Sequence, residues 1–139
     1  MKALVVYAHP EPRSFNCAMK DLAVETLRGR GAVEVTDLYA MKFKAIVGAD
    51  DFYGERADPE FLSIAAEQTL ACETGTLASD IVAEQKKLAR AELLILQFPI
   101  WWFGMPAILK GWADRVLARG FAYVADASMT QACCAERPR

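Results

Sequence analysis

The chain has 139 residues, of which 54% are hydrophobic and 24% charged. This length suggests one domain, and the composition provides for a buried core and excludes a disordered chain. A formal net charge of −2 gives no electrostatic reason to expect a nucleic acid or an anionic membrane surface as a partner.

Metal and disulfide chemistry have little support in the sequence. Four cysteines include no Cys-x-x-Cys pair, and the chain has one histidine, which argues against a zinc site. The adjacent Cys133 and Cys134 do not suggest a secreted disulfide framework, so we expect reduced thiols. Residues 93–109 carry no charge but are interrupted by Pro and Gly, which makes them a poor membrane helix. We therefore expect a cytoplasmic protein with no metal.

The first part of the chain has the pattern of a strand, a helix and a second strand. Residues 3–8 are apolar and rich in β-branched side chains, as in a central parallel strand. Ser14 is an N-cap candidate for a helix that stops at Gly29, and residues 33–38 alternate as a strand does. Residues 39–57 show no periodicity and are predicted to form an irregular excursion over the sheet.

The second part predicts two helices, a strand and a final helix. The first helix is expected from about Asp58 to Cys72, and the second, capped by Ser79, over residues 79–90. Residues 93–98 form another apolar run suited to a buried strand. A loop over residues 99–106 then leads into a helix that begins at Pro106 and ends near residue 119.

This order of elements predicts a doubly wound α/β sheet. Ligands of such sheets bind outside the carboxyl ends of the strands, where the strand order reverses. The loops over residues 9–14 and 99–106 both leave predicted strands, so we expect them to meet at that point.

The first of these loops leads into a helix N-terminus, which suits a phosphate group. His9, Arg13, Ser14 and Asn16 add hydrogen-bond donors. The segment has neither the Gly-x-Gly-x-x-Gly nor the Walker pattern, and an ordinary capped helix explains it equally well. A Rossmann interpretation, with Asp37 binding a ribose, lacks the glycine fingerprint.

The second loop carries three consecutive aromatic residues, Trp101, Trp102 and Phe103, between Pro99 and Pro106. Such a loop offers a flat apolar wall and backbone N–H donors against which a planar cofactor ring can lie. The alternative is that these aromatic side chains pack in the core or at an oligomer interface.

Together these segments resemble the NAD(P)H:quinone oxidoreductases of the flavodoxin-like superfamily, the DT-diaphorase type. The resemblance covers residues 1–123 and predicts a flavodoxin-like domain there. The segments that carry it are Tyr7-Ala8-His9-Pro10 with Ser14-Phe15-Asn16, residues 79–88, residues 97–112 and Phe121-Ala122-Tyr123.

The resemblance implies a homodimer that binds FAD tightly and reduces quinones at the subunit interface. Two groups of residues correspond to cofactor contacts of the family. The expected FAD-binding residues are His9, Ser14, Phe15, Asn16, Cys17, Pro99, Ile100, Trp102 and Phe103.

The implied substrate pocket is lined by Trp102, Phe103 and Tyr123, with Tyr123 serving the other subunit. The implied mechanism is ping-pong: NAD(P)H gives a hydride to the flavin and leaves, and a quinone then receives the hydride. No side chain of this protein is assigned as a catalytic acid or base, because the cofactor carries the chemistry.

Residues 124–139 depart from the family pattern and read as a divergent tail, such as a frameshift or truncation would give. The fourth strand and the Thr-Thr-Gly-Gly loop of the family are not found in them. An alternative function is therefore a non-catalytic remnant, or a subunit of a hetero-dimer with a full-length relative. A one-electron carrier that binds FMN, resembling flavodoxin, is a third hypothesis.

Overall fold

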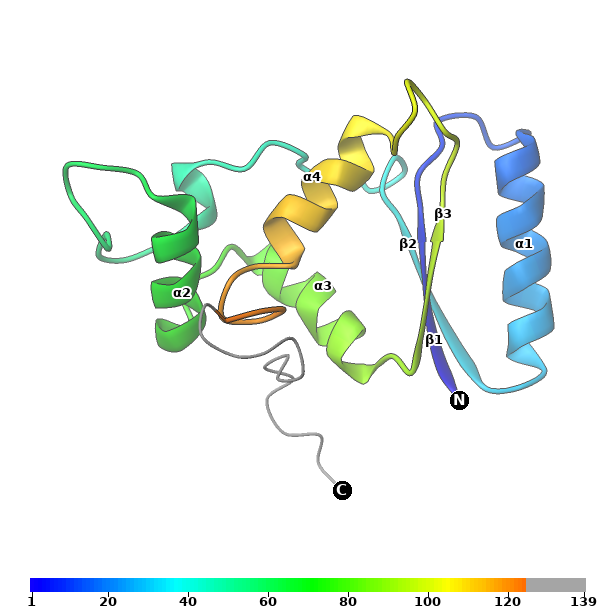
Figure 1. Ribbon diagram of the computed structural model, residues 1–139. Helices are drawn as coiled ribbons and strands as arrows, with labels where there is room; N and C mark the ends of the chain where they lie inside the picture. Colours follow the sequence, from blue (N-terminus) through cyan, green and yellow to red (C-terminus); the bar gives the residue numbers. More distant parts are fainter. Residues whose placement is uncertain (125–139) are drawn as a thin grey trace. The chain divides into compact units, whose positions relative to one another are not determined.

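The computed structural model describes residues 1–124, which form a parallel sheet and four α-helices (Figure 1). The order of elements agrees with the sequence prediction. It is β1 (Lys2–Tyr7), α1 (Phe15–Arg28), β2 (Ala32–Asp37), the 3₁₀ turn η1 (Ala49–Asp51), α2 (Ile64–Thr74), α3 (Ser79–Arg90), β3 (Leu93–Gln97) and α4 (Ala107–Val116).

The chain divides into two compact units. The first comprises residues 1–45 and 90–112, and the second comprises residues 46–89 and the described residues from 113 onward. A single domain over residues 1–123 stays a prediction. The tail expected over residues 124–139 lies, apart from Val124, outside the described residues, as do Cys133 and Cys134.

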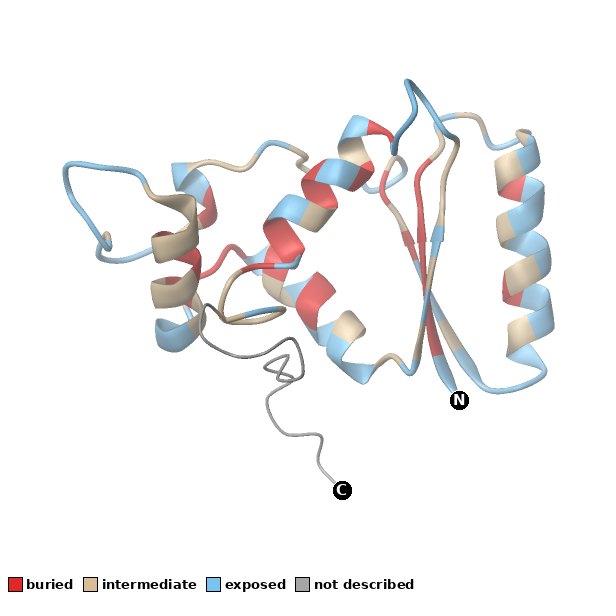
Figure 2. Ribbon diagram, in the orientation of Figure 1, coloured by how far each residue is buried: buried red, intermediate tan, exposed pale blue. Residues whose placement is uncertain are grey.

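The sheet of the first unit has the strand order β2-β1-β3, with both pairs parallel. In the central strand Val5 pairs with Val35 on one side and Ile95 on the other. Every residue of β1 after Lys2 is buried, whereas its two neighbours are partly exposed (Figure 2). A strand covered on both faces needs apolar side chains in both directions, which explains why β1 is a continuous apolar run.

Helix α1 covers one face of this sheet (Figure 1). The Gln97 side chain bonds to Asn16 of α1, and the Lys20 ammonium of α1 lies 5.1 Å from the centre of the Tyr7 ring. Gln97 and Tyr7 are partners in the strand register. Because strand residues alternate between faces, Val5 and Ile95 also point toward α1, whereas Leu4 points to the opposite face.

Strand β3 forms an edge of the sheet among the described residues. Leu94 and Leu96 are each 39% exposed, although their register partners Leu4 and Val6 are fully buried. An apolar edge strand in this condition is a surface that another strand or chain can cover.

Helix α4 approaches the sheet unit closely at Gly111. A Cβ atom at this position would lie 2.1 Å from the backbone oxygen of Ala45, which is in the same unit. Glycine is therefore required by a backbone-to-backbone approach and not by its dihedral angles.

Helix boundaries differ from the sequence prediction in three places. Helix α2 begins after Ser63, whose Oγ accepts from the Ala66 N–H at 3.4 Å, and not at Asp58. The Asp58 carboxylate instead accepts from the Glu60 N–H at 2.9 Å, a local bond that competes with helix formation. Ser79 lies inside α3 and does not precede it. Helix α4 ends at Val116 and not near residue 119, where the Arg119 N–H donates to the Gln68 side chain at 3.0 Å and not to a helical carbonyl.

The second unit packs around a small apolar cluster and a buried ion-pair network. The network centres on Arg115, whose guanidinium donates to Asp51 at 2.9 Å and to Asp80 at 2.6 Å. The side chains of Arg115 and Asp51 are each 1% exposed. The apolar cluster consists of Ala71, Leu77, Ala78 and Ile81.

Within residues 1–124, no helix combines the length and apolar character needed to cross a bilayer.

Replacing Arg115 with Met should lower the free energy of unfolding by about 3–5 kcal/mol, because it leaves the buried Asp51 carboxylate without its cation. Urea denaturation followed by circular dichroism measures this loss. The matched control is Arg90→Met, which removes an exposed pair with Glu34 and should cost at most about 1 kcal/mol. Similar losses for the two variants would contradict the role assigned to the network.

Candidate active site

The loops that follow β1 and β3 leave the sheet at the same end (Figure 1). One contact joins α1 to the end of β3, and a second joins the two loops themselves. The Gln97 amide donates to Asn16 Oδ1 at 2.7 Å, and the rings of His9 and Trp101 lie 5.9 Å apart at 57°. The predicted meeting of the two loops is therefore confirmed.

The β1–α1 loop is held by bonds within itself. His9 Nδ1 accepts from the Glu11 N–H at 3.0 Å, and the Ser14 N–H donates to the Glu11 carbonyl at 3.1 Å. The Arg13 side chain donates to the Glu11 carboxylate at 3.0 Å, and this bond lowers the pKa of Glu11. These bonds fix the conformation of the loop up to the first turn of α1.

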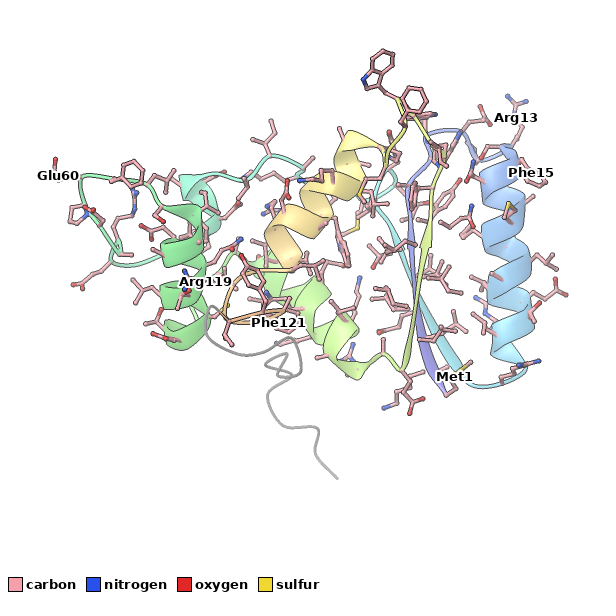
Figure 3. The ribbon with its side chains drawn as sticks, in the orientation of Figure 1. Met1, Arg13, Phe15, Glu60, Arg119 and Phe121 are labelled. Carbon is pink, nitrogen blue, oxygen red and sulfur yellow. The ribbon has the colours of Figure 1, made fainter. Side chains whose placement is uncertain are left out.

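The N-terminus of α1 has the properties of an anion site. Ser14 caps the helix, its Oγ accepting from the Cys17 N–H at 3.1 Å. The first intrahelical bond runs from the Ala18 N–H to the Ser14 carbonyl, so the N–H groups of Phe15 and Asn16 have no acceptor within the helix. The first turn contains no acidic residue. Figure 3 shows Phe15 at this end of α1, with its 79% exposed side chain turned away from the sheet.

The β3–α4 loop contains a tight aromatic turn. Trp101 and Gly104 exchange backbone hydrogen bonds of 2.9 and 3.1 Å, and the residues between them, Trp102 and Phe103, have φ values of 49° and 61°. Positive φ at both central positions is the pattern of a type I′ turn, in which Asn and Gly are favoured. For two bulky aromatic residues this backbone is strained.

The two central side chains of the aromatic turn are almost entirely in solvent. Trp102 is 94% and Phe103 95% exposed, and their rings lie 6.0 Å apart. The alternative that these side chains pack in the core is therefore wrong. Strain and exposure together indicate a turn that is shaped for binding and not for packing.

The remaining predicted site residues fall in three places. Pro99 is half-buried and Ile100 is 77% exposed in the second loop, while Cys17 is buried on α1 with its thiol 3.7 Å from Asp21 Oδ2. Tyr123 belongs to the second unit, where it is 50% exposed and lines a cavity of about 450 Å³. The predicted cofactor residues thus all lie at or near the carboxyl ends of the strands.

Two contributors to this end of the sheet were not among the expected FAD-binding residues. Gln97 and Trp101 supply the contacts that join the loops. Gln97 has a detectable signal, because it is a polar residue near the end of an otherwise apolar strand. The sequence has no signal that distinguishes Trp101 from Trp102.

Among residues 1–124, no group of three or more His, Cys, Asp or Glu side chains is placed to hold a metal ion.

Comparison with known proteins places the chain in a family. Residues 1–133 match the family with a flavodoxin-like fold, and the chain belongs to it. The NAD(P)H dehydrogenase (quinone) 1 of Rattus norvegicus is 54% identical over 123 residues, which are 88% of this chain and 45% of the rat protein. The resemblance to quinone oxidoreductases is therefore confirmed.

Solved structures agree with this assignment. A candidate quinone reductase from Klebsiella pneumoniae is 52% identical with a TM-score of 0.85, over 92% of this chain and 50% of that one. The general stress protein 14 of Treponema denticola, in complex with FMN, is 26% identical with a TM-score of 0.55, over 90% of this chain and 53% of that one. The chain spans about half the length of these relatives.

Replacing Trp102 with Asn should stabilise the ligand-free protein by about 1 kcal/mol, because Asn tolerates the positive φ that strains Trp. Little burial is lost, since the indole is 94% exposed. Urea denaturation measures the gain. The control is Phe61→Asn, an aromatic residue that is 68% exposed and not among the residues with positive φ, where no gain is expected. An unchanged or lowered stability for Trp102→Asn would show that the turn is not strained.

Proposed function

We propose that the protein is an FAD-dependent oxidoreductase that transfers a hydride from NAD(P)H to quinones. The observation that carries this proposal is that a helix N-terminus suited to a phosphate lies beside the loop with the exposed aromatic turn. The bond between Asn16 of the helix and Gln97, at the end of the preceding strand, holds the two together. The quinone-reducing relatives give it further support. Free thiols at Cys17 and Cys72 suit a cytoplasmic enzyme.

The first loop would hold the phosphate end of the cofactor. The N–H groups of Phe15 and Asn16 point out of the helix, and the positive end of the helix dipole adds to their attraction for an anion. Ser14 and His9 place a hydroxyl and an imidazole at the same end of the sheet. These donors fit a pyrophosphate, which is why we propose FAD.

The second loop would hold the flavin ring. Pro99 and Ile100 begin the loop beside the end of β3, and the rings of Trp102 and Phe103 give an apolar surface that excludes water from one side of the ring. A flavin bound there would supply hydride transfer between the nicotinamide and a quinone. The nicotinamide and the quinone would use the same place in turn, because both are flat and need the same face.

We further propose a homodimer. Two aromatic side chains that are almost fully exposed form a surface that a partner is expected to cover. Tyr123 carries a half-exposed ring in the second unit and would line the quinone pocket of the other subunit together with that subunit's aromatic turn.

A second candidate function is that of a subunit whose site is completed by another polypeptide. The observation that favours it is the edge strand β3, where Leu94 and Leu96 are each 39% exposed. Added strands along this edge would pair with the exposed backbone of β3 and shield both side chains on one side. In that case the chain by itself would not retain the flavin.

A visible absorption spectrum of the purified protein, with the released flavin identified by chromatography, separates these candidates. We expect a flavin band near one FAD per chain and NAD(P)H oxidation that depends on added quinone. Release of FMN would instead support the one-electron carrier. A protein that stays colourless after addition of FAD would refute the proposed function for this chain and favour the second candidate.

Trp102→Asn provides a sharper test in the same assay. Loss of the indole should weaken FAD binding about 10-fold, because an aromatic contact of this kind contributes about 0.5–1.5 kcal/mol beyond its buried area. Fluorescence titration of the apoprotein with FAD measures the dissociation constant. Phe61→Asn, which lies in the second unit, should bind FAD as the unchanged protein does. Equal affinity for both variants would remove Trp102 from the site.

A further inference from the structure

The buried hydroxyl of Tyr7 lacks a hydrogen-bond partner. Tyr7 ends β1 and is 2% exposed, and its ring is packed against the Lys20 ammonium. Within residues 1–124, its oxygen is the buried side-chain polar atom for which the structure shows no donor or acceptor.

Such a group is unfavourable for folding. A buried hydroxyl without a partner loses its bonds to water and gains none in return, whereas a Phe of the same shape would bury its ring without this cost. Native structures satisfy nearly all buried polar groups, so each exception calls for an explanation. The position of the hydroxyl supplies one.

The Tyr7 side chain lies beside the N-terminal part of α1, where it lines one cavity together with Cys17 and Lys20. Burial is the largest influence on the Tyr7 hydroxyl and raises its pKa; the Ser14 side chain lowers this pKa and the Cys17 thiol raises it. Ser14 and Cys17 are therefore neighbours of the hydroxyl and interact with it electrostatically, although neither meets the geometry of a hydrogen bond with it. Both belong to the turn whose free N–H groups form the candidate phosphate site.

Ser14 is able to connect the Tyr7 hydroxyl to the candidate phosphate site. Its Oγ already accepts from the Cys17 N–H, and a hydroxyl oxygen has a second lone pair and one proton to donate. A cavity of about 430 Å³, lined by Tyr7, His9 and Cys17 among others, borders the same turn and leaves room for small side-chain movements.

We propose that Tyr7 is a positioning residue for the phosphate end of the flavin, acting through Ser14. In the bound state the Tyr7 hydroxyl donates to Ser14 Oγ, and Ser14 donates its own proton to a phosphate oxygen. Hydrogen bonds in such a chain strengthen one another. The unpartnered hydroxyl of the free protein thus becomes satisfied when the cofactor binds. This inference rests on the proposed flavin function.

The first test is Tyr7→Phe, which removes the oxygen and keeps the ring. We expect a higher melting temperature for the apoprotein and a dissociation constant for FAD raised about 2- to 10-fold, the loss of one hydrogen bond. Tyr39→Phe is the matched control, since Tyr39 lines the same cavity but has no buried unpartnered oxygen, and it should change neither quantity. A lower melting temperature for Tyr7→Phe would show that the hydroxyl has a partner, and would overturn the proposal.

The second test is a double-mutant cycle with Ser14→Ala, read as FAD affinity. If Tyr7 acts through Ser14, Tyr7→Phe should cause no further loss in the Ser14→Ala background. An equal loss in both backgrounds would overturn the route through Ser14. Unchanged affinity of Tyr7→Phe, in a protein that does bind FAD, would overturn this inference alone. Failure of the unchanged protein to bind FAD would overturn the proposed function and this inference together.

Discussion

The parallel pairing of β1 with both β2 and β3 determines where the first unit can bind a ligand. The carboxyl ends of parallel strands lie on the same side of a sheet, so the loops after Tyr7 and Gln97 emerge side by side. Their contacts, from Asn16 to Gln97 and from His9 to Trp101, follow from that register. The burial of every β1 residue after Lys2 anchors this arrangement in the core of the first unit.

The candidate site is where the chain departs from its local preferences. Two aromatic residues adopt a backbone that suits Asn or Gly, and one tyrosine keeps a hydroxyl that the fold does not satisfy. Each departure costs free energy in the ligand-free state. Lys42, with a φ of 49°, is the one further non-Gly residue with positive φ in the described part of the first unit, and the departures at Tyr7, Trp102 and Phe103 lie together where β1 and β3 end. This concentration is typical of a site shaped for binding, whose cost is offset when the ligand is present.

The fold could be predicted from the sequence because its strong signals are local. The apolar runs at residues 3–8 and 93–98 and the cap at Ser14 gave the strands and α1 within about one residue. The start of α2 could not be predicted, since both a turn at Asp58 and a cap at Ser63 are compatible with the sequence there. The particular side-chain bonds between residues far apart in the chain were also beyond reach, although the meeting of the two loops was not.

The Arg115 network illustrates that limit, because its partners Asp51 and Asp80 lie 64 and 35 residues away along the chain. Likewise, the sequence places Trp102 and Phe103 in a loop, but their positive φ values arise from the closing bonds between Trp101 and Gly104. The family resemblance supplied the candidate cofactor residues, which composition and spacing alone left open.

Gly111 has a consequence for mutational studies of this protein. Its neighbour is a backbone oxygen, that of Ala45, which has no alternative rotamer and cannot move aside as a side chain can. Even the smallest substitution, a methyl group, would force the helix and the chain segment apart. In a random library selected for activity, position 111 would therefore emerge as invariant, as a binding residue would. Such invariance would report the distance between two stretches of main chain, and an assignment of sites from tolerance data should set this position aside.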